Sequence, residues 1–209
     1  MAKEILTGIK NIIFDMGGVI ININYHLTAH AFEKLGVKGF DKIFAQVQQI
    51  GFIDDFEMGK VSPAEFRNLI REVTNQIFSD AQIDEAWNSL ILDMPLNRIR
   101  ILEKVKNDFN IFLLSNNNAI HYGFLSKKFE SLYPILQLES LFQKTYYSHL
   151  IGMRKPNANA FNLVIQENNL TVSETLFIDD SPQHIEGGAK CGLNTFFVDE
   201  KNSWETLFG

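Results

Sequence analysis

The chain of 209 residues contains one cysteine, Cys191, and therefore no internal disulfide. This usage is compatible with a reducing cytoplasm, and we assign the thiol no role because a lone cysteine usually serves as a small buried residue. A basic run is also absent: 19 Lys and Arg stand against 25 Asp and Glu, giving a formal net charge of −6. An acidic chain of this kind is a poor candidate for binding nucleic acid or an anionic membrane.

Long apolar segments are missing as well. No stretch approaches the roughly 20 residues of a membrane span. The first ten residues, MAKEILTGIK, have neither the long apolar core nor the cleavage site of a secretory signal. We therefore expect a cytoplasmic protein with no membrane partner, and the sequence does not indicate its oligomeric state.

Repeats, low-complexity tracts and Pro/Gly-rich linkers are absent, and what recurs instead is short apolar runs of strand length. The runs are Ile9–Phe14, Ile111–Leu114, Thr145–Ser148, Thr175–Ile178 and Thr195–Val198. Helical patterns separate successive runs, and the gap between the first two differs from the others in its length of almost a hundred residues without a convincing strand. This alternation predicts an α/β fold with a Rossmann-like parallel sheet and helices on both faces.

The gap between the first two runs is almost entirely helical in pattern. Capping signals stand at SPAE (Ser62–Glu65) and SDAQ (Ser79–Gln82), and Pro95 begins a further helix towards Lys106. We therefore predict a core of residues 1–22 and 93–209, interrupted by an all-helical cap of residues 23–92.

Polar residues follow the predicted strands. Ligands of open parallel sheets bind outside the carboxyl ends of the strands, so these residues should meet on one rim. Asp15 follows the first strand, SNNN (115–118) the second, Lys155 a loop after the third, and Asp179 and Asp180 the fourth.

The residue types on this rim indicate phosphoryl chemistry. Carboxylates without Cys or His neighbours suit a hard cation such as Mg²⁺. A cation beside a hydroxyl, main-chain amides and Lys can neutralise a phosphoryl group while a nucleophile attacks in line. A carboxylate can be that nucleophile, forming an aspartyl phosphate that water hydrolyses.

Four motifs, in order over essentially the whole chain, resemble the haloacid dehalogenase (HAD) superfamily: FDMGGVI, LLSNNN, GMRKP and FIDDSPQHIEGG. The chain resembles subfamily I, with a helical C1 cap, and most closely the alpha-D-glucose-1-phosphate phosphatase-like subgroup. The resemblance implies a Mg²⁺-dependent phosphatase acting on a small phosphorylated metabolite, such as a sugar 1-phosphate. It implies that Asp15 is the nucleophile and that Lys155 binds both the nucleophile and the phosphate. Ser115 and Asn116 would also bind the phosphate. The implied metal ligands are Asp15, the Gly17 carbonyl, Asp180 and Asp179, and Asp179 would bind directly or through water.

Gly17 departs from the commoner pattern of this superfamily, which has an aspartate there as general acid and base. Loss of such a group typically costs about 10²–10⁴-fold in rate. Three alternatives stay open. Gly17 supports a catalytically weak HAD-like protein that binds a phosphorylated ligand or partner. A haloacid dehalogenase also lacks this aspartate but needs no metal, and a phosphomutase would itself need the acid/base. Because the leaving oxygen would depart with less proton assistance, we predict that sugar 1-phosphates react faster than 6-phosphates, and aryl faster than alkyl phosphates.

Substrate specificity is expected in the cap. The segment Phe52–Ser62, FIDDFEMGKVS, reads as an acidic loop before a capped helix, and its acids Asp54, Asp55 and Glu57 are candidates for the missing proton donor. None of the five histidines shows the spacing of a metal site with a third ligand, and we assign them no role.

Overall fold

The computed structural model describes residues 2–49 and 51–208. Five parallel strands form one sheet in the order β3-β2-β1-β4-β5, so β1 is central. The strands are β1 (Asn11–Phe14), β2 (Asn110–Ser115), β3 (Lys144–Tyr147), β4 (Thr175–Asp179) and β5 (Asn194–Phe197). In the register, Ile12 of β1 faces Ile111 of β2 and Leu176 of β4. The predicted fold class is confirmed.

The strand bounds differ from the predicted ones by one or two residues. The largest difference is at the start of β1, which begins at Asn11 rather than Ile9. The N–H of Ile9 donates to the Leu6 carbonyl in a turn, and Gly8 has φ +78°. The chain therefore enters the sheet only after this turn.

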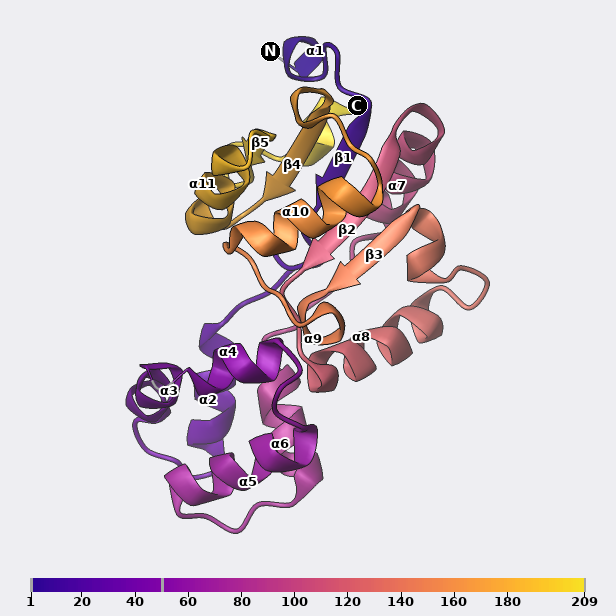
Figure 1. Cartoon of the computed structure of the whole chain (residues 1–209). Coiled ribbons are helices and arrows are strands. Elements are labelled where there is room, and N and C mark those ends of the chain that lie inside the picture. Colours follow the sequence, from indigo (N-terminus) through magenta and orange to yellow (C-terminus); the bar gives the residue numbers. More distant parts are fainter. Residues whose placement is uncertain (1, 50, 209) are drawn as a thin grey trace.

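Helices cover both faces of the sheet (Figure 1). Outside the first gap they are α1 (Ala2–Ile5), α7 (Leu96–Asp108), α8 (Ala119–Leu132), α9 (Ser148–Ile151), α10 (Ala158–Glu167) and α11 (Pro182–Lys190), with short 3₁₀ turns η1 (Leu138–Leu141), η2 (Val172–Glu174) and η3 (Trp204–Leu207). Side chains of β1 alternate between the two faces, as a strand requires. Ile12 and Phe14 join the apolar cluster under α7, α8 and η3, whereas Ile13 joins the one under α10.

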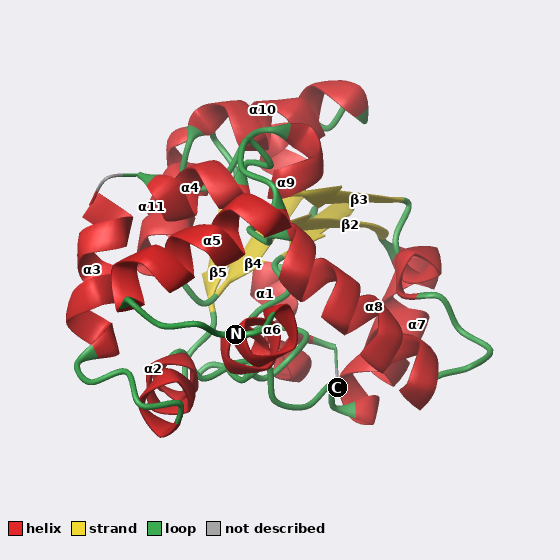
Figure 2. Ribbon diagram, turned by 90° about the horizontal axis from the view of Figure 1, so that it is seen from below, coloured by secondary structure: helices red, strands yellow, loops and turns green. Residues whose placement is uncertain are grey.

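The described residues between β1 and β2 form helices joined by loops, with two isolated bridges and no strand of the sheet. The insertion helices are α2 (His26–Lys34), α3 (Phe40–Gln49), α4 (Phe52–Glu57), α5 (Pro63–Thr74) and α6 (Asp80–Asn88). They lie beyond the arrowheads of the strands in Figure 1, and in front of the sheet when the molecule is seen from below in Figure 2. They bury an apolar cluster of their own, to which Ile120 of α8 also belongs. The prediction of a loop at the start of Phe52–Ser62 is wrong, because Phe52–Glu57 is helical and packs Ile53 and Phe56 into that cluster.

Both predicted capping boxes form. The Ser62 side chain accepts from the Glu65 N–H and Glu65 accepts from the Ser62 N–H, with Pro63 at the first helical position. Ser79 and Gln82 make the same reciprocal pair at the start of α6. These contacts satisfy N–H groups that a helix start leaves without intrahelical partners.

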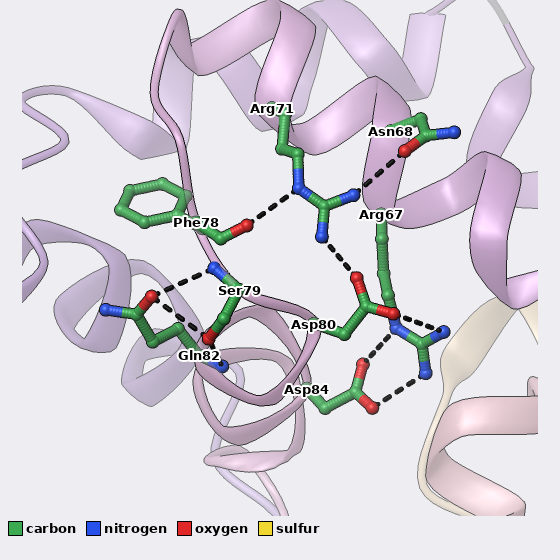
Figure 3. Close-up of polar contacts among 8 residues, drawn as sticks. All are labelled: Arg67, Asn68, Arg71, Phe78, Ser79, Asp80, Gln82 and Asp84. Carbon is green, nitrogen blue, oxygen red and sulfur yellow. Dashed lines mark hydrogen bonds and ion pairs between the residues drawn. The ribbon is translucent and has the colours of Figure 1, made fainter.

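A polar network joins α5 to α6 (Figure 3). Arg67 forms a two-pronged pair with Asp84, in which Nε and Nη2 each lie 2.8 Å from a carboxylate oxygen. Arg71 donates to the Phe78 carbonyl at 2.7 Å and also contacts Asp80. Two parallel hydrogen bonds fix orientation as well as distance, so α6 is held firmly on α5.

The two chain segments that connect the insertion to the sheet run side by side. Ile23 and Ile91 form an antiparallel bridge. The Asn22 N–H donates to the Asp93 carbonyl at 2.9 Å, and the Leu92 N–H donates to the Asn22 carbonyl at 3.0 Å.

Among the described residues, no helix is long and apolar enough to cross a bilayer.

Candidate active site

Three of the predicted site residues meet directly at the end of the central strand. The Lys155 Nζ lies 2.8 Å from Asp15 Oδ1 and 2.6 Å from Asp179 Oδ2. Lys155 and Asp179 are fully buried, and Asp15 is 7% exposed. An ammonium buried this deeply needs such partners, and the two carboxylates supply them.

Hydrogen bonds to neighbouring segments fix the positions of Asp15 and Lys155. The Asp15 N–H donates to the Ile178 carbonyl at 2.9 Å, which extends the β1–β4 pairing by one residue. The Asn116 side chain clamps the loop that carries the lysine: its Nδ2 donates to the Lys155 carbonyl and its Oδ1 accepts from the Lys155 N–H, each at 2.9 Å. Asn116 therefore positions Lys155, a role that its place in the sequence did not indicate.

Asp179 uses both carboxylate oxygens within the protein. Besides the contact with Lys155, its Oδ1 accepts from the Ser181 N–H at 2.8 Å and lies 3.0 Å from His184 Nδ1. The Lys155 charge and the His184 hydrogen bond outweigh burial and lower the pKa of Asp179. Sequence reasoning missed His184, although its place in the first turn of α11, five residues after Asp179, is a usable signal.

Asp180, unlike Asp179, has a carboxylate without partners among the described residues and a raised pKa. Within the described chain its half-buried carboxylate forms no ion pair and no hydrogen bond to another residue, and it lies directly against Gly18. Burial and the charge of Asp179 raise its pKa to about 6. Burial also raises the pKa of Asp15, to about 7, because its effect outweighs that of the Lys155 charge. Three carboxylates thus face one ammonium, and a divalent cation would supply the missing positive charge.

The carboxylates and histidine that lie close enough to share one ion are Asp15, Asp179 and His184, with ligand atoms within 4.8 Å of one another. Lys155 Nζ already lies between Asp15 and Asp179, so a second cation there would meet strong repulsion. The donor set that fits a hard cation is the free oxygen of Asp15, the unpaired carboxylate of Asp180 and the Gly17 carbonyl. Asp179, whose oxygens are occupied, fits a contact through water.

A cavity of about 170 Å³ lies between this rim and the insertion helices. Gly17 and residues 115–118 line it from the sheet side. The Ser115 hydroxyl makes only a long contact of 3.4 Å with the Asn116 carbonyl, and the Asn116 N–H has no acceptor among the described residues. Both groups are therefore available to a phosphate.

Further side chains line or border the cavity, and Tyr25, His121 and Arg154 among them were not assigned from the sequence. Tyr25 and Glu57 line the cavity, as does His121 from α8. Arg154, next to the lysine, binds Glu57 Oε2 through Nη2 at 2.9 Å and Asp54 Oδ1 through Nη1 at 2.8 Å. Of the three acids named as proton donors only Glu57 lines this cavity, since Asp55 pairs with Lys60 on the surface at 2.9 Å.

Comparison with known proteins agrees with this geometry. The family model of haloacid dehalogenase-like hydrolases matches residues 9–192. A D-ribitol-5-phosphate phosphatase from Bacteroides thetaiotaomicron is 30% identical over 197 residues, which cover 94% of this chain and 95% of that protein.

Solved structures extend the likeness. A HAD family enzyme from Bacteroides thetaiotaomicron superposes with a TM-score of 0.89 at 35% identity, covering 97% of this chain and 99% of that one. The structure of this enzyme in complex with magnesium and inorganic phosphate has a TM-score of 0.88 at 35% identity, covering 96% of this chain and 100% of that one. A predicted HAD-like family hydrolase from Porphyromonas gingivalis has a TM-score of 0.83 at 28% identity, covering 94% of each chain.

The chain belongs to the haloacid dehalogenase-like hydrolase family. The predicted superfamily is confirmed, and the predicted enzyme class and Mg²⁺ cofactor are supported by these relatives.

Proposed function

We propose that the protein is a Mg²⁺-dependent phosphatase that hydrolyses a small phosphorylated metabolite through an aspartyl phosphate on Asp15. The observation that carries this function is the arrangement of Asp15. Its carboxylate is buried at the end of the central strand, 2.8 Å from Lys155 Nζ, and it stands immediately before the lining of a cavity. A relative solved with magnesium and phosphate and a curated phosphatase relative support the same chemistry.

The residues divide the reaction between them. One carboxylate oxygen of Asp15 attacks phosphorus while the other is left for the cation, and the bond from phosphorus to the leaving oxygen breaks with its electron pair on that oxygen. Lys155 holds Asp15 in place and offsets negative charge on the phosphoryl oxygens, while Ser115 and the Asn116 N–H bind those oxygens. Water then attacks the acyl phosphate, which releases inorganic phosphate and restores Asp15. When bound, Mg²⁺ supplies charge neutralisation at Asp15, the Gly17 carbonyl and Asp180.

The insertion, residues 23–92, acts in this proposal as a cap that shields the phosphoenzyme from bulk water. Its motion would concentrate in the paired connections, at 21–24 and 93–95. The antiparallel pairing of these segments favours a joint rotation over independent movement of either one.

Two substrate classes compete. The relative named for D-ribitol 5-phosphate favours a phosphorylated sugar alcohol, which has an alkoxide leaving group. Gly17 favours a leaving group that needs little proton assistance, such as that of a sugar 1-phosphate. Rates on D-ribitol 5-phosphate, glucose 1-phosphate and glucose 6-phosphate separate the two classes.

The test of the activity is phosphate release by purified protein with and without Mg²⁺. We expect activity with Mg²⁺, silence in EDTA, and loss of turnover in Asp15→Asn with the fold retained by circular dichroism. Wild-type turnover in Asp15→Asn would disprove the mechanism. Full activity in thoroughly chelated protein would favour dehalogenase-like chemistry, and inactivity on every phosphate would favour a binding protein.

A further inference from the structure

Two residues that line the cavity have buried hydrogen-bond donors without partners among the described residues. Trp87 of α6 and Asn117 both line the cavity, and they are 4% and 5% exposed. Within the described chain neither Trp87 Nε1 nor Asn117 Nδ2 has a hydrogen-bond partner. Buried donors in native proteins are nearly always paired, so two unpaired donors on residues that line one cavity are candidates for hydrogen bonds to a ligand.

His121 adds an acceptor to this wall. Its Nδ1 lies 2.8 Å from Asn88 Oδ1. An amide oxygen only accepts, so Nδ1 carries the ring proton and Nε2 is left with a lone pair. Burial lowers the pKa of His121 to about 3, which keeps the ring neutral. The lone pair on Nε2 has no donor among the described residues.

The Trp87 and His121 rings pack against each other. The His121 and Trp87 rings are stacked with centroids 5.2 Å apart and planes 4° from parallel. One ring comes from α8 beside the sheet and the other from α6 of the insertion. The network of Arg67 and Asp84 fixes α6 on α5 and so supports the position of Trp87 (Figure 3). The stacked pair therefore forms only when the insertion rests on α8.

The charges around the cavity restrict its occupant. Its described lining includes no Lys or Arg, and its acids are Asp41 and Glu57. A second phosphate or a carboxylate on the substrate would meet no cation here. A hydroxyl group both donates and accepts, so a chain of hydroxyls can serve the Trp87 and Asn117 donors and the His121 acceptor together.

We propose that Trp87, His121 and Asn117 form a subsite for the uncharged, polyhydroxylated part of the substrate, and so select polyol phosphates against hydroxyl-free and doubly anionic ones. This subsite rests on the proposed phosphatase function, because it places the leaving group of that reaction. Asn88 acts as a positioning residue that holds the tautomer of His121.

A matched pair of substrates tests the selection. D-Ribitol 5-phosphate and n-pentyl phosphate share a five-carbon chain and a primary alkoxide leaving group, and differ in the hydroxyls. We expect the wild-type protein to have the higher kcat/KM for the ribitol ester. Trp87→Phe and His121→Phe each remove one hydrogen bond and keep an aromatic ring. Each should reduce the ratio of the two kcat/KM values about three- to tenfold, the usual worth of one neutral hydrogen bond.

The control is Ile77→Ser, a fully exposed position between α5 and α6, which should keep the wild-type ratio. A wild-type ratio in both aromatic variants would overturn the subsite, and so would equal rates of the wild-type protein on the two esters. Absence of phosphate release from any ester would instead count against the proposed function.

A second measurement does not depend on turnover. In Asp15→Asn protein with Mg²⁺, D-ribitol 5-phosphate should shift the indole N–H resonance of Trp87 downfield. The other tryptophan, Trp204, is an internal reference because its Nε1 already donates to the Val19 carbonyl at 2.9 Å. Trp87→Phe assigns the two signals. An unmoved Trp87 signal at saturating ligand would refute the subsite even if the enzyme proves to be a phosphatase.

Discussion

Arg154 holds Glu57 across the boundary between the sheet and the insertion. Nη2 and Nε of Arg154 lie 2.9 and 3.0 Å from Glu57 Oε2. Because Arg154 directly precedes Lys155, one loop supports the nucleophile and also fastens α4 over the site. Burial outweighs Arg154 and raises the pKa of Glu57, so this carboxyl keeps its proton to a higher pH than a free glutamate.

Glu57→Gln tests whether this carboxyl supplies the proton that Gly17 lacks. The amide keeps the size and can still accept from Arg154, but it cannot release a proton to the leaving oxygen. We expect kcat for alkyl phosphates to fall about 10²-fold, with a much smaller loss for p-nitrophenyl phosphate, whose leaving group needs no proton. Asp55→Asn, at the surface pair with Lys60, is the control. An equal loss on both substrate types would assign Glu57 to cap docking alone.

Gly18→Ala should weaken metal binding. Gly18 has φ +72°, and a Cβ there would overlap the Asp180 carboxylate, so Asp180 must move. We expect the concentration of Mg²⁺ for half-maximal activity to rise at least tenfold. Gly8→Ala is the matched control because Gly8 has φ +78° with nothing near the added Cβ. Both variants lose about 1 kcal/mol through the left-handed backbone. Unchanged Mg²⁺ dependence in Gly18→Ala would remove Asp180 from the proposed ligands.

Gly59→Ala should loosen the insertion. Gly59 follows α4 with φ +70°, and a Cβ there would overlap the main-chain carbonyl of His149 at α9. A backbone carbonyl cannot turn away as a flexible side chain can, so the contact between α4 and α9 must open. We expect faster hydrogen exchange at α9 and a higher KM. Gly39→Ala, with φ +69° and open space, should show neither change. Wild-type exchange at α9 would show that the two elements dock independently of Gly59.

Gly17→Asp should restore proton assistance. A Cβ at Gly17 would meet only the end of the Ile23 side chain, 3.1 Å away at Cδ1, and a small rotation of Ile23 relieves this contact. We expect hydrolysis of glucose 6-phosphate to rise relative to glucose 1-phosphate by about tenfold. Gly17→Asn has the same shape without a titratable proton and should leave the ratio as it is. If Asp and Asn change the ratio alike, shape rather than acid catalysis explains the effect.

Local pattern was enough to predict much of this molecule. Apolar runs of strand length predicted the sheet, because a strand buried on both faces must be apolar along its length. SPAE and SDAQ predicted the starts of α5 and α6, since capping boxes involve residues only three apart. The positions of Asp15 and Lys155 also followed, because the carboxyl ends of parallel strands share one edge.

Contacts between distant segments were not predictable. Glu57 and Arg154 are far apart in the chain, as are Trp87 and His121, and neither pair shows a local signal. Phe52–Glu57 reads as an acidic loop, yet it is helical because Ile53 and Phe56 are buried in the insertion's core. The sequence alone determined the strands, the capping boxes of α5 and α6, and the chemical groups at the strand ends. Only the tertiary structure decided which of those groups are already paired and which remain open to a ligand, because pairing depends on distances that folding creates.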